Sequence, residues 1–157
     1  MVWGVLTALL LSILFIICQV PAQARAKYQD TIYVLVIDQR TDSLTVAAAV
    51  AGWVCEQYPI KKVYWVPGSG ITQEKVEDSF RRPKGCTVKL DKCLGNAVAE
   101  AYALLFAHTK ATKVLLFLPS LVEPDEEDIK IISKLPYEGV VIYGLDEYGN
   151  QWKAPRM

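Results

Sequence analysis

The sequence predicts an α/β fold: a three-layer sandwich with a mostly parallel central sheet, helices on both faces, and a hydrophobic segment at the N-terminus. Short runs rich in β-branched residues alternate with longer stretches of helical periodicity, which is typical of strands joined by helical crossovers. Such crossovers are right-handed, so they distribute the helices over both faces of one sheet. A chain of 157 residues has room for one such domain.

The first half of the domain is predicted to hold two strands and two helices. Residues 31–38 (TIYVLVID) are β-formers that end in an acid, which favours a central strand buried on both faces. Residues 43–58 follow as an Ala- and Val-rich helix, and Pro59 lies just past its end. Residues 62–66 (KVYWV) form the next strand, from which a Pro-Gly-Ser-Gly turn leads into a short polar helix near residues 72–80.

The second half repeats the alternation after an irregular stretch at residues 81–90. Residues 91–109 predict a long helix, because their apolar side chains recur at helical spacing and form one stripe. Residues 113–118 (KVLLFL) are a buried strand. Residues 124–134 are a helix whose consecutive acids suit the positive helix end and fan out into a solvated first turn. Residues 139–145 (GVVIYGL) are the last clear strand.

The N-terminal segment contains no charged side chain over its first 24 residues and is rich in Leu, Ile, Val, Phe and Ala. An apolar run of this length suits the core of a signal peptide and is also just long enough to span a membrane. Residues 1–24 are therefore expected to be a signal peptide or membrane anchor, and residues 25–30 a linker. Residues 31–146 are expected to form a Rossmann-like domain, and residues 147–157 a C-terminal tail.

Two features of this segment point to opposite topologies. The tripeptide Ala-Gln-Ala at residues 22–24, shortly after Pro21, favours cleavage by a signal peptidase. Arg25 and Lys27 follow the segment, and the positive-inside tendency would place them in the cytoplasm. We expect export, with the domain periplasmic or anchored in the inner membrane through residues 1–20 and facing the periplasm. A cytoplasm-facing sensor is the alternative.

Charge and cysteine content narrow the range of partners. Lys plus Arg and Asp plus Glu both number 17, so no long-range electrostatic field steers the domain towards nucleic acid. Nucleic acid is therefore not expected as a partner. Cys86 and Cys93 are the nearest pair in the domain, and in an oxidising compartment they are expected to form a disulfide. Cys55 is interpreted as buried apolar filler.

The loop after the first strand is the most informative candidate site, because ligands of open parallel sheets gather at the carboxyl ends of strands. Asp38 stands at the tip of the strand, and Asp42 adds carboxylate oxygens at the start of the next helix. This arrangement resembles the metal-binding loop of von Willebrand factor A-type domains.

The resemblance covers nearly all of the chain after residue 30. The stretch 85–91, which contains Thr87 and runs into residues 94–97, is similar to the threonine loop that precedes a helix in that family. Residues 139–144 are similar to its closing strand. The resemblance implies a divalent-metal site for Mg²⁺ or Ca²⁺, made by Thr87 and the two aspartates of the first loop.

The departures from the family pattern weigh against that site. Arg40 and Asp42 stand where the family places hydroxyls, and a guanidinium cannot ligate a cation. Arg40 can instead lie beside Asp38 and Asp42 and neutralise them in place of a metal. A further strand that should end in an acid ends in Pro119 and Ser120. The sequence therefore predicts a degraded metal loop and no cofactor, with Mg²⁺ or Ca²⁺ as the alternative.

No set of residues in the sequence predicts catalysis. Export, small size and the lack of catalytic groups favour a non-catalytic protein-interaction domain. We expect it to be a component of an envelope-spanning secretion or conjugation assembly, with other envelope proteins as its partners. Arg40 and Trp152 are the interaction candidates, and the tail that bears Trp152 either docks a partner or folds back on the sheet edge. The alternative is a metal-dependent binding module or phosphate-handling enzyme that uses the Asp38 loop.

Overall fold

The computed structural model describes residues 31–40, 43–120, 124–135 and 139–145, together with the backbone of residues 151–153. The chain divides into the units Met1–Thr31 and Ile32–Met157, and the fold described here is that of the second. The expected signal peptide or anchor, Asp42 and the side chain of Trp152 lie outside the described residues. Within the described ranges, no helix has both the length and the apolar character needed to cross a bilayer.

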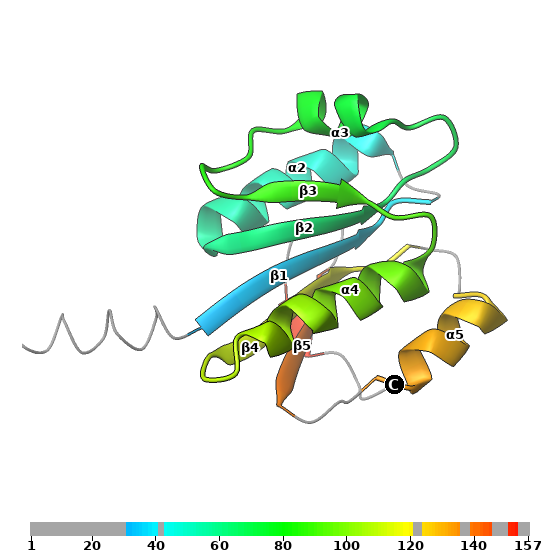
Figure 1. Cartoon of the computed structure of the whole chain (residues 1–157). Coiled ribbons are helices and arrows are strands. Elements are labelled where there is room, and N and C mark those ends of the chain that lie inside the picture. Colours follow the sequence, from blue (N-terminus) through cyan, green and yellow to red (C-terminus); the bar gives the residue numbers. More distant parts are fainter. Residues whose placement is uncertain (1–30, 41–42, 121–123, 136–138, 146–150, 154–157) are drawn as a thin grey trace, which may run out of the picture. The chain divides into compact units, whose positions relative to one another are not determined.

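Six strands form one sheet in the order β3-β2-β1-β4-β5-β6 (Figure 1). Five of them are parallel, and β6 runs antiparallel to β5. This confirms the predicted α/β class with a mostly parallel sheet. In chain order the strands are β1 (Thr31–Asp38), β2 (Ile60–Val66), β3 (Thr87–Leu90), β4 (Thr112–Leu118), β5 (Val140–Leu145) and β6 (Gln151–Lys153).

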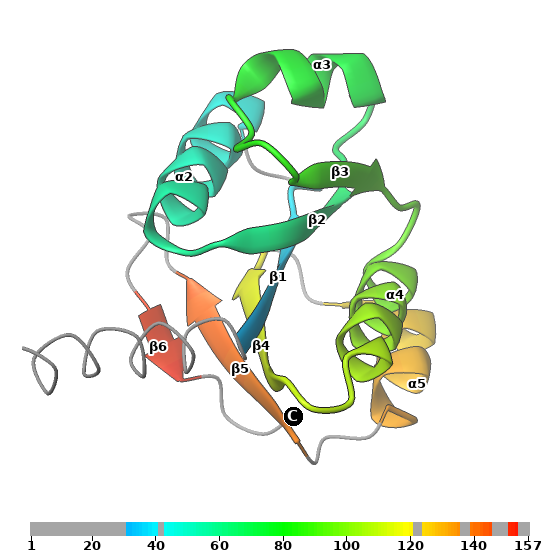
Figure 2. The ribbon, with the colours of Figure 1, turned by 60° about the vertical axis from the view of Figure 1, so that its left-hand side comes forward.

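Helices cover both faces of the sheet, as Figure 2 shows. One face carries α2 (Leu44–Gln57) and α3 (Gln73–Ser79), and the other carries α4 (Leu94–Ala107) and α5 (Glu126–Ser133). From β1, the next two strands along the chain, β2 and β3, are added on one side of the sheet. After β3, the chain crosses over through α4 and continues with β4, which pairs on the other side of β1. This reversal makes the carboxyl ends of β1 and β4 the topological switch point, where open α/β sheets bind ligands.

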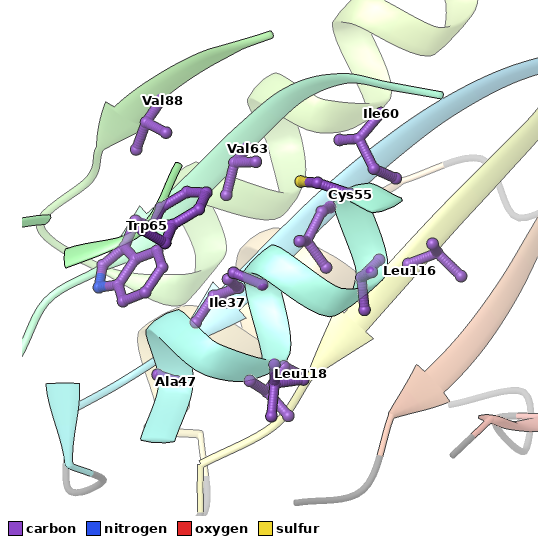
Figure 3. Packing of buried hydrophobic residues seen from close by; sticks show 14 of the residues in the cluster. Ile37, Ala47, Cys55, Ile60, Val63, Trp65, Val88, Leu116 and Leu118 are labelled. Carbon is purple, nitrogen blue, oxygen red and sulfur yellow. The ribbon is translucent and has the colours of Figure 1, made fainter. Parts of the chain in front are cut away.

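Strand β1 is the centre of two apolar cores. Its alternate side chains Leu35 and Ile37 belong to the cluster under α2 and α3, while Val34 and Val36 belong to the cluster under α4. All four are fully buried, which confirms the expectation of a strand covered on both faces. Figure 3 shows the first cluster, in which α2 packs over Trp65 and its neighbours.

Two strands differ from the expectations. The stretch predicted to be irregular contains β3, an edge strand of four residues with an exposed–buried alternation too short to register as a periodic run. The tail expected to be exposed contains β6, whose backbone pairs with β5 between Tyr143 and Leu145. The backbone of residues 151–153 therefore follows the fold-back alternative for the tail.

The expected Cys86–Cys93 disulfide is not formed in this structure, and both cysteines are free thiols. Cys86 directly precedes β3, and Cys93 follows its far end as the N-cap of α4. The four extended residues of β3 alone span about 10 Å from first to last Cα atom, whereas the Cα atoms of a disulfide lie within about 7 Å of each other. Closeness in sequence was misleading because the intervening segment is a strand.

Candidate functional site

The switch point is occupied by four residues from β1, α4 and α5, which we call the switch-point cluster: Asp38, Arg40, Gly95 and Asp128. Asp38 is the last residue of β1, and Arg40 follows two positions later. Gly95 lies in the first turn of α4, and Asp128 lies in the first turn of α5. Residues separated by up to 90 positions in the sequence thus meet at one edge of the sheet.

Asp38 and Arg40 form a bidentate ion pair. The guanidinium donates from Nε to Oδ1 at 2.9 Å and from Nη2 to Oδ2 at 2.8 Å, so both carboxylate oxygens are engaged. Asp38 is only 2% exposed, while the Arg40 side chain is 24% exposed. The hydrogen bond to Asp38 raises the pKa of Arg40 above its ordinary value, although burial opposes this. This geometry confirms that Arg40 lies beside Asp38.

Asp128 is the member of the cluster that the sequence reasoning missed. It is fully buried, not solvated as expected for the acidic first turn of α5. Its Oδ1 accepts a hydrogen bond of 2.7 Å from the backbone N–H of Gly95, and its Oδ2 lies 3.7 Å from Nη1 of Arg40. The preceding Asp125 caps α5 by accepting from the Asp128 N–H at 2.8 Å. Four consecutive acids gave no signal to single out the one that faces inwards.

Gly95 explains how α5 approaches α4 so closely. A Cβ atom at this position would lie 2.9 Å from Cδ1 of Ile131 and 3.2 Å from Cα of Asp128. To accept a Cβ atom, the end of the Ile131 side chain would have to move, and the backbone of α5 at Asp128 would have to give by a few tenths of an ångström. The absence of a side chain therefore lets the Gly95 N–H, near the partially positive end of α4, reach the Asp128 carboxylate.

The charges of the cluster balance through one guanidinium and one helix end. Arg40 neutralises Asp38 directly and attracts Asp128. Asp128 also interacts with the partially positive N-terminal end of α4 through the Gly95 N–H. A divalent cation at this place would have to displace Arg40, because both oxygens of Asp38 already accept from it. The arrangement links β1, α4 and α5 through the protein's own cation, Arg40.

The structure does not bring Thr87 to this site. Thr87 is the exposed first residue of β3 and stands in register with Lys62. Asp38 is in register with Val66, four residues further along β2. At about 3.3 Å per residue, these positions differ by about 13 Å along the strands. Thr87 was therefore a wrong candidate ligand beside Asp38, because it lies towards the other end of the sheet.

Gln39 holds the neighbouring loop in place. Its side chain is buried, and Oε1 accepts from Nε1 of Trp65 at 3.1 Å and from the backbone N–H of Gly68 at 3.2 Å. The N–H of Gly68 is thus engaged by the protein itself, within the turn predicted to lead from this strand into the next helix. The sequence reasoning had assigned Gln39 no role, because a lone amide carries no signature.

A second group of charges lies beside α4. Asp91, directly after β3, is nearly buried, and Glu100 on α4 forms an ion pair with Lys89. Burial, followed by the interaction with Glu100, raises the pKa of Asp91 from 3.8 to about 6, while Lys89 and Lys62 oppose this rise. Burial also raises the pKa of the adjacent Tyr64. Asp91 therefore keeps its proton to a higher pH in the folded domain than in the unfolded chain.

This raised pKa predicts that stability falls as the pH rises. Between about pH 4 and 6 the folded state keeps a proton on Asp91 that the unfolded state has released, so unfolding becomes easier through this window and levels off above it. The free energy of unfolding of Asp91→Asn should therefore change by about 1–2 kcal/mol less over this pH window than that of the unchanged protein. Urea unfolding of both proteins between pH 4 and 8 measures it. Parallel stability curves for the two proteins would contradict the raised pKa.

The outer face of α2 is apolar over about two turns. We define this α2 outer face as Val46, Ala49 and Trp53, whose spacing places them on one side of the helix. All three are exposed, with Val46 at 48% and Trp53 at 43%. No charged residue occurs in α2 before Glu56. Sequence reasoning missed this face, although an Ala- and Val-rich helix with a Trp one heptad after a Val was a usable signal.

The chain matches no protein-family model, no curated protein and no solved structure. The resemblance to von Willebrand factor A-type domains therefore stays a prediction that rests on residues of the sequence.

Proposed function

We propose that this domain is a non-catalytic protein-interaction domain, exported to or anchored at the outer side of a bacterial inner membrane, and a component of an envelope-spanning secretion or conjugation assembly. The single observation that carries the interaction role is the α2 outer face with its exposed Trp53. The uncharged segment at residues 1–24 supports the location. The partner is another envelope protein that presents an apolar surface to α2.

The chemistry of the α2 outer face supports a protein partner. Tryptophan is enriched among residues that dominate binding energy, and interface centres are depleted of charge. Both properties coincide on α2, where Trp53 is exposed and the flanking turns carry no charge before Glu56. The switch-point cluster supports the non-catalytic part, because the acid at the strand tip is held in a bidentate pair with Arg40.

Replacing Trp53 by serine is expected to weaken partner binding about 30-fold or more without changing the melting temperature. The reason is that an exposed tryptophan contributes to the free energy of binding at an interface and contributes little to the free energy of unfolding. The full-length tagged chain is extracted from membranes, the co-purifying protein is identified, and its affinity is measured for both proteins. A photo-crosslinking residue at position 53 should form an adduct with the same partner.

Ile129 on α5 provides the matched control, because it is 55% exposed and apolar but belongs to a helix on the other face of the sheet. Ile129→Ser should retain the partner, and a crosslinker at 129 should give no adduct with it. Equal loss of the partner in both variants, or retention in both, would refute α2 as the interaction surface.

The metal-dependent alternative is tested separately by calorimetric titration of the same chain with Mg²⁺, Ca²⁺ and Mn²⁺. Binding that disappears in Asp38→Ala would establish a metal site and would require Arg40 to leave Asp38. We expect no such binding, because both oxygens of Asp38 accept hydrogen bonds from the guanidinium.

A further inference from the structure

Two buried thiols from different elements meet in the core. Cys55 lies in the last turn of α2, and Cys86 lies just before β3, 31 positions later. Both belong to the core cluster under α2 and α3, and the side chain of each is the largest cause of the shifted pKa of the other, so the two thiols are close enough to interact. Figure 3 shows the sulfur of Cys55 directed from α2 towards β2, near Val63. This pair was not expected, because the residues are far apart in sequence.

Cys86 also borders the protein surface. Residues 77–86 line an open hollow of about 620 Å³, and Cys86 is the last residue of this lining. The same lining holds three cations, Arg81, Arg82 and Lys84, and two acids, Glu77 and Asp78, so positive charge is in slight excess. Arg82 forms an ion pair with Glu77 at 3.5 Å. Cys55 does not contribute to it. A solute can thus approach Cys86 from the hollow, with Cys55 behind it in the core.

The two thiols differ in acidity. The hydrogen bond from Cys55 lowers the pKa of Cys86, and the charge of Arg82 lowers it further, although burial opposes both. The same hydrogen bond and burial raise the pKa of Cys55. Cys86 is therefore the sulfur that becomes a thiolate, and Cys55 is the sulfur that keeps its proton. A thiolate that a solute can reach and that lies near a cation is the usual attacking group in thiol–disulfide exchange.

We propose that Cys55 and Cys86 are a redox-active dithiol that is oxidised to a disulfide by small-molecule disulfides entering the hollow at residues 77–86. The Cys86 thiolate attacks one sulfur of the incoming disulfide, forms a mixed disulfide and releases the first thiolate. Cys55 gives its proton to that thiolate and attacks Sγ of Cys86, which releases the second thiolate, and this takes up the proton that Cys86 had lost. The protein loses two electrons and two protons, and the small disulfide becomes two thiols.

The resulting cross-link ties the end of α2 to the start of β3. It closes a loop that contains β2 and α3, so it restricts the unfolded chain. A compartment rich in disulfides would keep the pair oxidised, and a reducing one would keep it as thiols. This inference goes beyond the interaction role and does not depend on it, since the pair lies in the core and not on the α2 outer face.

Peptide mapping tests the proposal on the purified full-length chain in detergent. The chain is incubated with oxidised glutathione under native conditions and digested without reduction. We expect a cross-link between Cys55 and Cys86, with Cys93 left free or modified only by glutathione. The oxidised chain should melt about 5–15 °C higher than the reduced chain, because a loop of this length is closed. A Cys86–Cys93 cross-link, or no cross-link, would overturn the proposal.

Three serine variants separate the roles of the sulfurs. Cys55→Ser should stop at a stable glutathione adduct on Cys86, and Cys86→Ser should give no adduct on Cys55 because its thiol is buried and keeps its proton. Cys93→Ser should still form the cross-link and show the same rise in melting temperature. Circular dichroism confirms that each variant folds. An adduct that forms on Cys55 as fast as on Cys86 would contradict the assigned order of attack.

Discussion

Replacing Arg40 by methionine is expected to destabilise the domain by about 3 kcal/mol. The substitution keeps much of the apolar stem but removes the only cation that contacts Asp38 and Asp128 among the described residues. Their side chains are 2% and 1% exposed, so each carboxylate would stay buried without its counter-charge. Urea unfolding at neutral pH measures the loss as a lower midpoint with an unchanged slope.

A double-mutant cycle assigns this loss to the ion pair. Asp38→Asn removes the charge that Arg40 neutralises and keeps a side chain of similar size. The double variant Asp38→Asn, Arg40→Met should be less destabilised than the sum of the two single variants, with a coupling of about 1–3 kcal/mol. Simple additivity, or a loss below about 0.5 kcal/mol for Arg40→Met, would show that the pair behaves like an ordinary surface ion pair.

Replacing Trp65 by alanine is expected to cost about 3–5 kcal/mol. Trp65 is fully buried in β2, its ring stacks on Phe80 with centroids 5.9 Å apart, and its Nε1 donates to Oε1 of Gln39. The substitution leaves a cavity and removes one of the donors that hold Gln39 over the loop at Gly68. Thermal and urea unfolding should both show the effect.

The chain supplies a matched control in its other described tryptophan. Trp53 is 43% exposed on α2, so Trp53→Ala should change the free energy of unfolding by no more than about 0.5 kcal/mol. Comparable losses for the two tryptophans would mean that the core under α2 does not rest on Trp65.

The sequence by itself determined the elements that rest on local pattern. Residues 31–38 are β-formers throughout, and they form β1 with the expected burial on both faces. The helix predicted over residues 43–58 forms over Leu44–Gln57 and ends before Pro59. The ion pair of Asp38 and Arg40 was also foreseeable, because the two residues are two positions apart and of opposite charge. In each case the deciding interactions are short-range along the chain.

Only the tertiary structure decided which distant residues meet. Asp128 reaches Arg40 and Gly95 because the strand order returns β4 and α5 to the side of β1. The thiol of Cys86 meets Cys55 and not Cys93, because an extended strand separates the nearer pair. Such contacts depend on the crossovers and on how tightly helices pack, and neither leaves a periodic trace in the sequence. The site was therefore predictable at Asp38 and Arg40, where neighbours interact, and unpredictable wherever the sheet brings remote segments together.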